Sequence, residues 1–314
     1  MILFNSHEVT SPVNETMSPV MKKNPDYFIA MTYFLLSFFI LFGSATAPAY
    51  SADDAADWNN KAVDLSKTGR YEEAIAAFDK AISLGLQRAD EAMAWTMKGL
   101  SLGSLGRHEE AIKAYDKAIS LGLRKDLEAY AWYEKGSSLR ALGRHEEATK
   151  AFDKAISLGL KKEAEAYAWY SNGSSLRALG RHEEAIKAFD KAISLGLKKE
   201  DEAYAWYFEA FSFGTLGRQE ETTKAFDKAI SLGLKKEDEA SAWYSNGSSL
   251  RTLGRHAEAT KAFDKAISLG LNHRDETYAW YYKGLSLRAL GRNEEATKAF
   301  DKAINLDVSF EGIK

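Results

Sequence analysis

The chain has 314 residues, of which 45% are hydrophobic and 28% are charged, with four prolines and no cysteine. The formal net charge of -3 lacks the basic excess that nucleic-acid-binding proteins carry, so we expect no nucleic-acid partner. The absence of cysteine excludes disulfides, thiolate metal sites and a cysteine nucleophile.

The N-terminal part has the pattern of an export signal. Lys22 and Lys23 precede an apolar run over 27–42, and small residues follow it. This order is typical of a cleaved secretory signal. The alternative is an uncleaved membrane anchor, for which the run is slightly short because a span needs about 20 residues. Both alternatives place the rest of the chain outside the cytoplasm. Since the residues before Met21 do not resemble a signal, we expect translation to start at Met17 or Met21.

Tryptophan marks an internal repeat over the rest of the chain. A fixed period between 20 and 50 residues indicates a solenoid, in which each unit buries its apolar face only when a neighbour stacks on it. The tryptophans, each 37 residues from the next, are Trp58, Trp95, Trp132, Trp169, Trp206, Trp243 and Trp280.

Each unit has the pattern of two helices. In the second unit, Trp95 and Leu102 lie on one apolar helix face, and Gly106 ends that period. A second apolar stripe follows over 108–121, and Gly122 predicts a left-handed C-cap. The sequence therefore predicts one helical hairpin per unit.

These residues resemble the tetratricopeptide repeat family. Its W-x2-L-G-x2-Y…A-x3-F pattern is followed by Trp132, Gly136, Leu139, Ala148 and Phe152, and it recurs in register along the chain. The resemblance implies an all-α fold, a right-handed α-solenoid of seven antiparallel helix-turn-helix repeats. The unit is three residues longer than the family's 34, and we expect the first helix to gain most of a turn.

The repeated small and aromatic residues are assigned to the core. Gly136 lets two helices approach closely, Ala148 fits the opposing surface, and Trp and Phe fill the space between units. Ala62 and Ala210 replace the glycine in two units, and Thr222 replaces the alanine in one. We assign the tryptophans to packing rather than to ligand binding, because a recurrent aromatic on an apolar stripe is normally core.

A different stripe of the first helices is the candidate binding surface, called the Tyr/Arg face below. Tyrosine recurs two residues before and directly after the tryptophan, and arginine eight residues after it; offsets of 3 and 7 share a helix face. In the family that the chain resembles, this face lines the concave groove where partner peptides lie. Tyrosine gives contact area at small entropic cost, and arginine adds bidentate or stacking contacts. The candidate residues are Tyr130, Tyr133, Arg140, Tyr167, Tyr170, Arg177, Tyr204, Tyr207, Phe211, Tyr244, Arg251, Tyr278, Tyr281 and Arg288.

A structural interpretation of the same stripe stays open. In it, the tyrosines bridge adjacent first helices, the arginines pair with a neighbour's glutamate, and duplication copies both without any ligand.

The fifth unit departs from its sisters. Phe208, Phe211 and Phe213 stand where other units have serine, asparagine or leucine, and Gly214 stands at the arginine position. We expect Phe213 to replace a core leucine, and Phe211 to be partly exposed and to contact a partner.

The residues that carry chemistry are copied once per unit. A catalytic centre needs one asymmetric cluster of nucleophile, base and orienting group, and none stands out. His108 and His145, in the hairpin turns, lie a unit apart, too far to share a metal. We therefore expect no enzyme activity, no catalytic residue, no metal and no cofactor.

The sequence divides into a leader over 1–52, seven repeats over 53–308 and a tail over 309–314. We predict an exported, non-catalytic scaffold that binds an extended protein or peptide segment on the Tyr/Arg face. The alternative is binding of an envelope glycan or similar polar polymer by the same residues. The last repeat lacks a solvating helix, which predicts self-association or a tail that folds back. A membrane is expected to be contacted only through an uncleaved leader.

Overall fold

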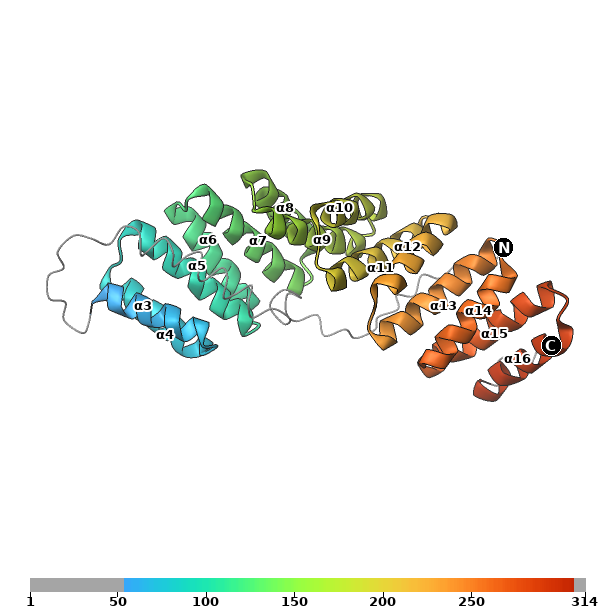
Figure 1. Cartoon of the computed structure of the whole chain (residues 1–314). Helices are drawn as coiled ribbons and strands as arrows, with labels where there is room; N and C mark the ends of the chain where they lie inside the picture. Colours follow the sequence, from blue (N-terminus) through green and yellow to red (C-terminus); the bar gives the residue numbers. More distant parts are fainter. Residues whose placement is uncertain (1–53, 308–314) are drawn as a thin grey trace. The chain divides into compact units, whose positions relative to one another are not determined.

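The computed structural model describes residues 54–307, and every regular element in this range is an α-helix (Figure 1). The helices pair as hairpins, so that repeat 1 consists of α3 and α4 and repeat 7 of α15 and α16. The expected all-α solenoid of helix-turn-helix repeats is confirmed. The leader and its apolar run over 27–42 lie outside the described residues, as does the tail.

The first helices have nearly uniform bounds. From repeat 2 onward each has 17 residues, and the second helices have 14. Because only three residues separate a second helix from the next first helix, the extra residues of the unit extend the first helix, as predicted. The helices of repeats 1–3 are α3 (Ala55–Lys67), α4 (Tyr71–Leu84), α5 (Arg88–Ser104), α6 (His108–Leu121), α7 (Lys125–Ala141) and α8 (His145–Leu158). Those of repeats 4–7 are α9 (Lys162–Ala178), α10 (His182–Leu195), α11 (Lys199–Thr215), α12 (Gln219–Leu232), α13 (Lys236–Thr252), α14 (His256–Leu269), α15 (His273–Ala289) and α16 (Asn293–Leu306).

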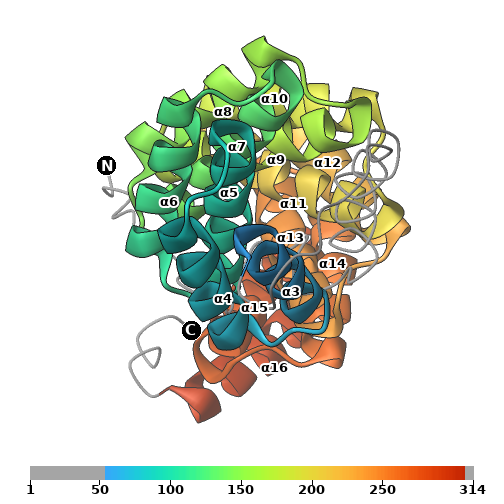
Figure 2. The ribbon, with the colours of Figure 1, turned by 90° about the vertical axis from the view of Figure 1, so that its left-hand side faces the viewer.

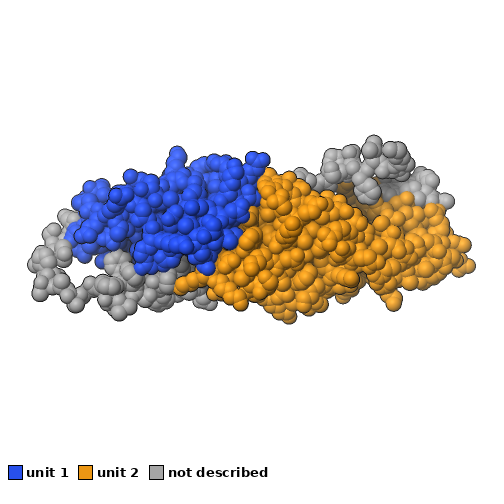
Figure 3. All heavy atoms as spheres, turned by 90° about the horizontal axis from the view of Figure 1, so that it is seen from above, with its two compact units in different colours: residues 1–160 blue, residues 161–314 orange. Residues whose placement is uncertain are grey.

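The contacts divide the chain into two compact units, residues 1–160 and 161–314 (Figure 3). The first holds repeats 1–3 and the second holds repeats 4–7. Within each unit, a first helix packs on its own second helix and on the second helix of the preceding repeat, as α11 does with α12 and α10 (Figure 2). This is the nearest-neighbour stacking that a solenoid requires.

A glycine turn closes each hairpin. In repeat 2, Gly106 has a φ of 75°, a conformation that costs glycine nothing. The Arg107 N–H donates to the Leu102 carbonyl at 2.9 Å, and the Gly106 N–H donates to the Gly103 carbonyl at 3.0 Å. This pair of bonds is a Schellman motif, which satisfies the last carbonyls of the helix. Gly122 ends the second helix, as predicted, with a positive φ of 90°, although its ψ of 95° lies outside the left-handed helical region.

The helices of a hairpin approach closely where glycine faces phenylalanine. Phe263 is fully buried, and a Cβ on Gly247 would lie 2.9 Å from its ring. Gly136 faces Phe152 in the same way, and a Cβ on it would lie 2.8 Å from the ring. The predicted role of this glycine is therefore confirmed.

Replacing Gly247 by alanine is expected to lower the free energy of unfolding by about 1–3 kcal/mol, because the methyl group has no room. Gly214→Ala is the control. Gly214 also lies on a first helix within residues 161–314, and its Cβ would lie 3.7 Å from Thr222, an ordinary van der Waals distance. It should be neutral or stabilising by up to about 1 kcal/mol through helix propensity. Denaturant unfolding of both variants checks this, and equal effects would show that the approach is not tight.

Helices α3–α16 include none that is long and apolar enough to span a bilayer.

Candidate interaction surface

In three repeats the tryptophan joins neighbouring hairpins through a stacked lysine. In repeat 3, the Trp132 indole N–H donates to Glu128 at 3.3 Å, and the Lys135 ammonium lies 4.7 Å from the ring centroid. The same ammonium pairs with Asp116 of the preceding hairpin at 2.5 Å. Repeats 2 and 7 have the same arrangement. The tryptophans are half-buried packing residues, in agreement with their assignment from the sequence.

The tyrosines two residues before the tryptophan bridge adjacent first helices in repeats 4 and 5. The Tyr167 hydroxyl donates to Asp201 at 2.7 Å, and the Tyr204 hydroxyl donates to Asp238 at 2.6 Å. Burial, helped by the bond to Asp238, raises the pKa of Tyr204 above its ordinary value, so its hydroxyl stays protonated. These bonds are the ones that the structural interpretation expects.

The tyrosines two residues before the tryptophan make other contacts in repeats 3 and 7. The Tyr130 hydroxyl donates to Glu134 of its own helix at 2.5 Å. Burial raises the pKa of this glutamate to about 7, and the hydrogen bond opposes that change. Tyr278 stacks on Tyr282 with centroids 5.9 Å apart. These tyrosines therefore also contact residues of their own helices.

The tyrosines directly after the tryptophan point into the hairpins. Tyr133, Tyr170 and Tyr207 are only 2%, 8% and 8% exposed. Each ring contacts the phenylalanine of its own second helix, at centroid distances of 5.9–6.1 Å. Tyr244 and Tyr281 make the same contact at 6.2 and 6.0 Å while keeping partly exposed edges. Whether these tyrosines touch a partner stays a prediction, but they are part of the core.

Three of the four arginines eight residues after the tryptophan lie on aromatic rings. The guanidinium of Arg177 is 5.0 Å from the Phe208 centroid, and that of Arg251 is 4.8 Å from the Tyr282 centroid, each ring belonging to the next first helix. Arg288 lies 5.4 Å from the ring of Phe300. Among the described residues, no hydrogen bond or ion pair engages the side chain of Arg140, Arg251 or Arg288. The pairing with a neighbour's glutamate that the structural interpretation expects is therefore not found for these three.

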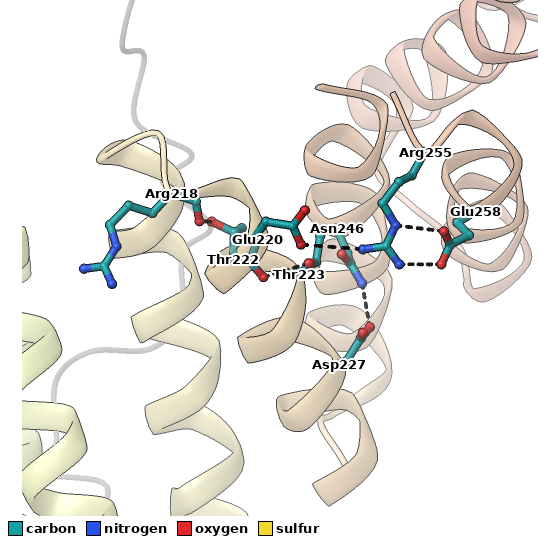
Figure 4. Close-up of polar contacts among 8 residues, drawn as sticks. All are labelled: Arg218, Glu220, Thr222, Thr223, Asp227, Asn246, Arg255 and Glu258. Carbon is teal, nitrogen blue, oxygen red and sulfur yellow. Dashed lines mark hydrogen bonds and ion pairs between the residues drawn. The ribbon is translucent and has the colours of Figure 1, made fainter. Parts of the chain in front are cut away.

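The arginines of the hairpin turns behave in the opposite way. Arg255 donates to both carboxylate oxygens of Glu258, at 2.8 and 2.6 Å, and lies 3.9 Å from Glu220 of the preceding repeat (Figure 4). Every repeat has such a bidentate or paired turn arginine. In each repeat, the turn arginine is therefore paired with a nearby glutamate. The arginines of the Tyr/Arg face are a separate set.

Repeat 5 adds a cluster of rings to this face. Phe208 stacks on Phe189 of repeat 4 at 6.4 Å, and Phe211 meets Tyr207 at 4.9 Å and Phe226 at 5.2 Å. Phe211 remains partly exposed and Phe213 is buried, as predicted for both. In the same repeat, the Thr222 hydroxyl donates to the Arg218 carbonyl at 2.9 Å, which accounts for a polar residue at the alanine position (Figure 4).

Sequence reasoning missed a row of residues three positions after the tryptophan. Here Lys98, Lys135 and Lys283 pair with an aspartate of the preceding second helix, and Asn246 donates to Asp227 at 2.8 Å (Figure 4). Repeat 5 has Glu209 instead. Aligning the units on their tryptophans would have exposed this exception.

Glu209 is a buried carboxyl with no donor. It is 2% exposed, and its Oε2 atom has no hydrogen-bond partner in the described part of the chain. Burial, and then the nearby charge of Asp190, raise the pKa of Glu209 to about 8, against the opposing charge of Arg218. Burial also raises the pKa of Asp190. The junction between repeats 4 and 5 therefore brings two carboxyls together where other junctions have a donor and an acceptor.

Residues 54–307 contain no group of three or more His, Asp or Glu side chains suited to hold a metal ion. The chemistry that the first helices offer is that of oriented cations and packed rings, which suits recognition.

Helical hairpins repeated every 37 residues define a repeat scaffold, and the sequence comparison gives its family. A model described as tetratricopeptide repeat matches residues 59–125, 96–159, 133–204 and 244–307. The chain belongs to the tetratricopeptide repeat family, whose members generally act as non-catalytic scaffolds and bind protein or peptide partners. No curated protein matches the chain in sequence.

Solved structures share the fold. The C-terminal part of a repeat-containing protein from Cytophaga hutchinsonii is 15% identical, with a TM-score of 0.64 over 81% of this chain and 99% of that one. A tetratricopeptide repeat protein from Parabacteroides merdae is 18% identical, with a TM-score of 0.53 over 81% of this chain and 93% of that one. YrrB is 22% identical, with a TM-score of 0.53 over 62% of this chain and 93% of that one. At these identities the likeness shows the fold alone.

Proposed function

We propose that this scaffold binds an extended segment of another protein along the Tyr/Arg face of its first helices. One observation carries the proposal: the side chains of Arg140, Arg251 and Arg288 form no hydrogen bond or ion pair within the described residues, while every turn arginine is paired. A guanidinium has five N–H donors, and the rings beneath Arg251 and Arg288 leave those donors unused. Such donors are suited to a partner.

The tyrosines hold the Tyr/Arg face in place. Because Tyr170 and Tyr207 are buried and their neighbours Tyr167 and Tyr204 bond to the next helix, the face is fixed before a partner arrives. A preorganised surface loses less entropy on binding. The related fold YrrB is described as a protein with an unusual peptide-binding site, which favours a peptide over the alternative of a glycan.

Site-specific photo-crosslinking tests the proposal. A photoreactive residue at Ser248, which is partly exposed on α13, should crosslink to a protein partner, whereas one at exposed Lys261 on α14 should not. Substituting alanine for Tyr170 or Tyr207 is unsuitable, because it would remove core rings. Crosslinks only from Lys261, or only to a carbohydrate at Ser248, would contradict the proposal.

We also propose that the protein is exported, on the basis of Lys22, Lys23 and the apolar run over 27–42. Cell fractionation and the N-terminal sequence of the mature protein distinguish a cleaved signal from a retained anchor. A mature chain that is found in the cytoplasm with its leader intact would contradict export.

The non-catalytic role and self-association through the last repeat remain part of the proposal. The first follows from the family, and the second keeps the expectation drawn from the last repeat. Sedimentation of the full chain at several concentrations measures the second.

A further inference from the structure

Three side chains on consecutive first helices of the second unit point to the chemistry of the partner. Phe211 lies on α11, Arg251 on α13 and Arg288 on α15, at five, eight and eight residues after their tryptophans. Positions three apart share one helix face. Phe211 and Arg251 are partly exposed and Arg288 is exposed. A partner along this face therefore meets one apolar ring followed by two cations.

The two cations are oriented but not neutralised. Arg251 lies on Tyr282 at 4.8 Å and Arg288 on Phe300 at 5.4 Å, so rings fix both guanidinium groups. The turn arginines of the same two repeats, Arg255 and Arg292, are held by two bonds each to glutamate. Charge complementarity therefore predicts that carboxylates of the partner pair with Arg251 and Arg288, and not with Arg255 and Arg292.

The surroundings disfavour a dense polyanion. The first turns of the same helices carry acidic residues, among them Asp238, Glu239 and Asp275. These lie at the opposite end of the helices from Arg251 and Arg288, so a nucleic acid or a sulfated polysaccharide that covered the whole face would meet like charge at that end. Separate carboxylates on a peptide avoid that repulsion.

The repeat sets the spacing of those carboxylates. The first helices α13 and α15 contact each other directly. Helices in contact lie about 8–10 Å apart, and an extended chain advances about 3.3 Å per residue, so one repeat corresponds to about three residues of the partner. We infer that the second unit binds an extended peptide with two acidic residues three positions apart and an apolar residue three positions beyond, matched to Arg288, Arg251 and Phe211. This inference rests on the proposed function and names its partner's chemistry.

Fluorescence anisotropy with the full chain tests the inference on synthetic peptides. The probe is an extended peptide with the acidic-x-x-acidic-x-x-apolar pattern, and a second version carries the pattern in reverse order. Its counterparts carry glutamine in place of glutamate, or the same residues with the two glutamates adjacent. We expect each counterpart to bind at least about ten-fold more weakly, because charge-assisted bonds are lost or misplaced.

Paired variants of the protein complete the test. Arg251→Gln with Arg288→Gln should weaken binding of the acidic peptide about ten-fold or more, and Arg255→Gln with Arg292→Gln should leave it within about two-fold. Phe211→Ser should weaken only peptides that have the apolar residue. Equal binding of the glutamine peptide, equal losses in both arginine pairs, or stronger binding of a heparin oligosaccharide would overturn the inference.

The two proposals fail in different ways. If the protein segment crosslinked at Ser248 lacks spaced acidic residues, the scaffold function stands and the acidic pattern is wrong. If no protein is crosslinked there, the scaffold function itself is wrong.

Discussion

Replacing Glu209 by lysine is expected to raise the free energy of unfolding of repeat 5 by about 3–5 kcal/mol at pH 8 and above, since it removes an unpaired buried charge. The lysine would take the place that Lys283 has beside Asp264 in repeat 7, and would pair with Asp190. The variant thus converts a pair of carboxyls into a donor and an acceptor.

The expected pH dependence has a definite sign. The pKa of Glu209 is raised in the folded protein to about 8 from an ordinary value of 4.5, so the folded state holds a proton that the unfolded state releases. Its contribution to stability is complete below pH 4.5 and is lost as the pH rises to about 8, at up to about 1.4 kcal/mol per pH unit. Asp190 and Arg218 are the charged groups that face it.

Denaturant unfolding between pH 5 and 9, with hydrogen exchange to localise the effect, measures this dependence. Glu209→Gln should remove the slope without adding an ion pair. Asn246→Asp, which places a second carboxyl beside Asp227, should create a similar slope one junction further on. A wild-type slope that persists in Glu209→Gln would show that another group is responsible.

Replacing Phe263 by alanine is expected to lower the free energy of unfolding by about 3–5 kcal/mol. The ring is fully buried, it fills the space left by Gly247, and it meets Tyr244 at 6.2 Å and Tyr282 of the next repeat at 6.3 Å. The cavity would weaken repeat 6 and its contact with repeat 7. Since solenoid repeats are stabilised by their neighbours, unfolding should then separate into more than one transition.

Phe211→Ala is the matched control for this prediction. Phe211 is also a phenylalanine of the second unit but is partly exposed, so its loss should cost about 1 kcal/mol and leave a single transition. Calorimetry and denaturant unfolding compare the two variants. A similar cost for both would mean that the buried rings are not what couples the repeats.

The sequence predicted the fold in detail because its signals are local and are repeated. The spacing of the tryptophans set the hairpins, Gly106 and Gly122 predicted the helix ends, and Gly136 predicted the close helix contact. Each of these depends on backbone geometry or on one neighbouring side chain, which the period of the helix determines.

The candidate surface was less predictable, because it depends on how two helices cross. Tyr170 follows the tryptophan by one position, at the border between the hairpin interior and the outer face, and only the packing against Phe189 decides its orientation. The stack of Arg251 on Tyr282 joins residues 31 positions apart in different repeats, and no helical period relates them. Glu209 was missed because it stands out only when the repeats are aligned and compared with one another.

The aspartates on the second helices make the repeats interchangeable parts. Asp116, Asp227 and Asp264 accept from either lysine or asparagine of the following first helix. A repeat with such a donor keeps this polar pair whichever repeat precedes it, so the pair is preserved when the array gains or loses a whole hairpin. Repeat 5 is the exception, because Glu209 offers no such donor to the preceding hairpin, and its excision would bring Asn246 to Asp190 and leave a complementary junction in its place.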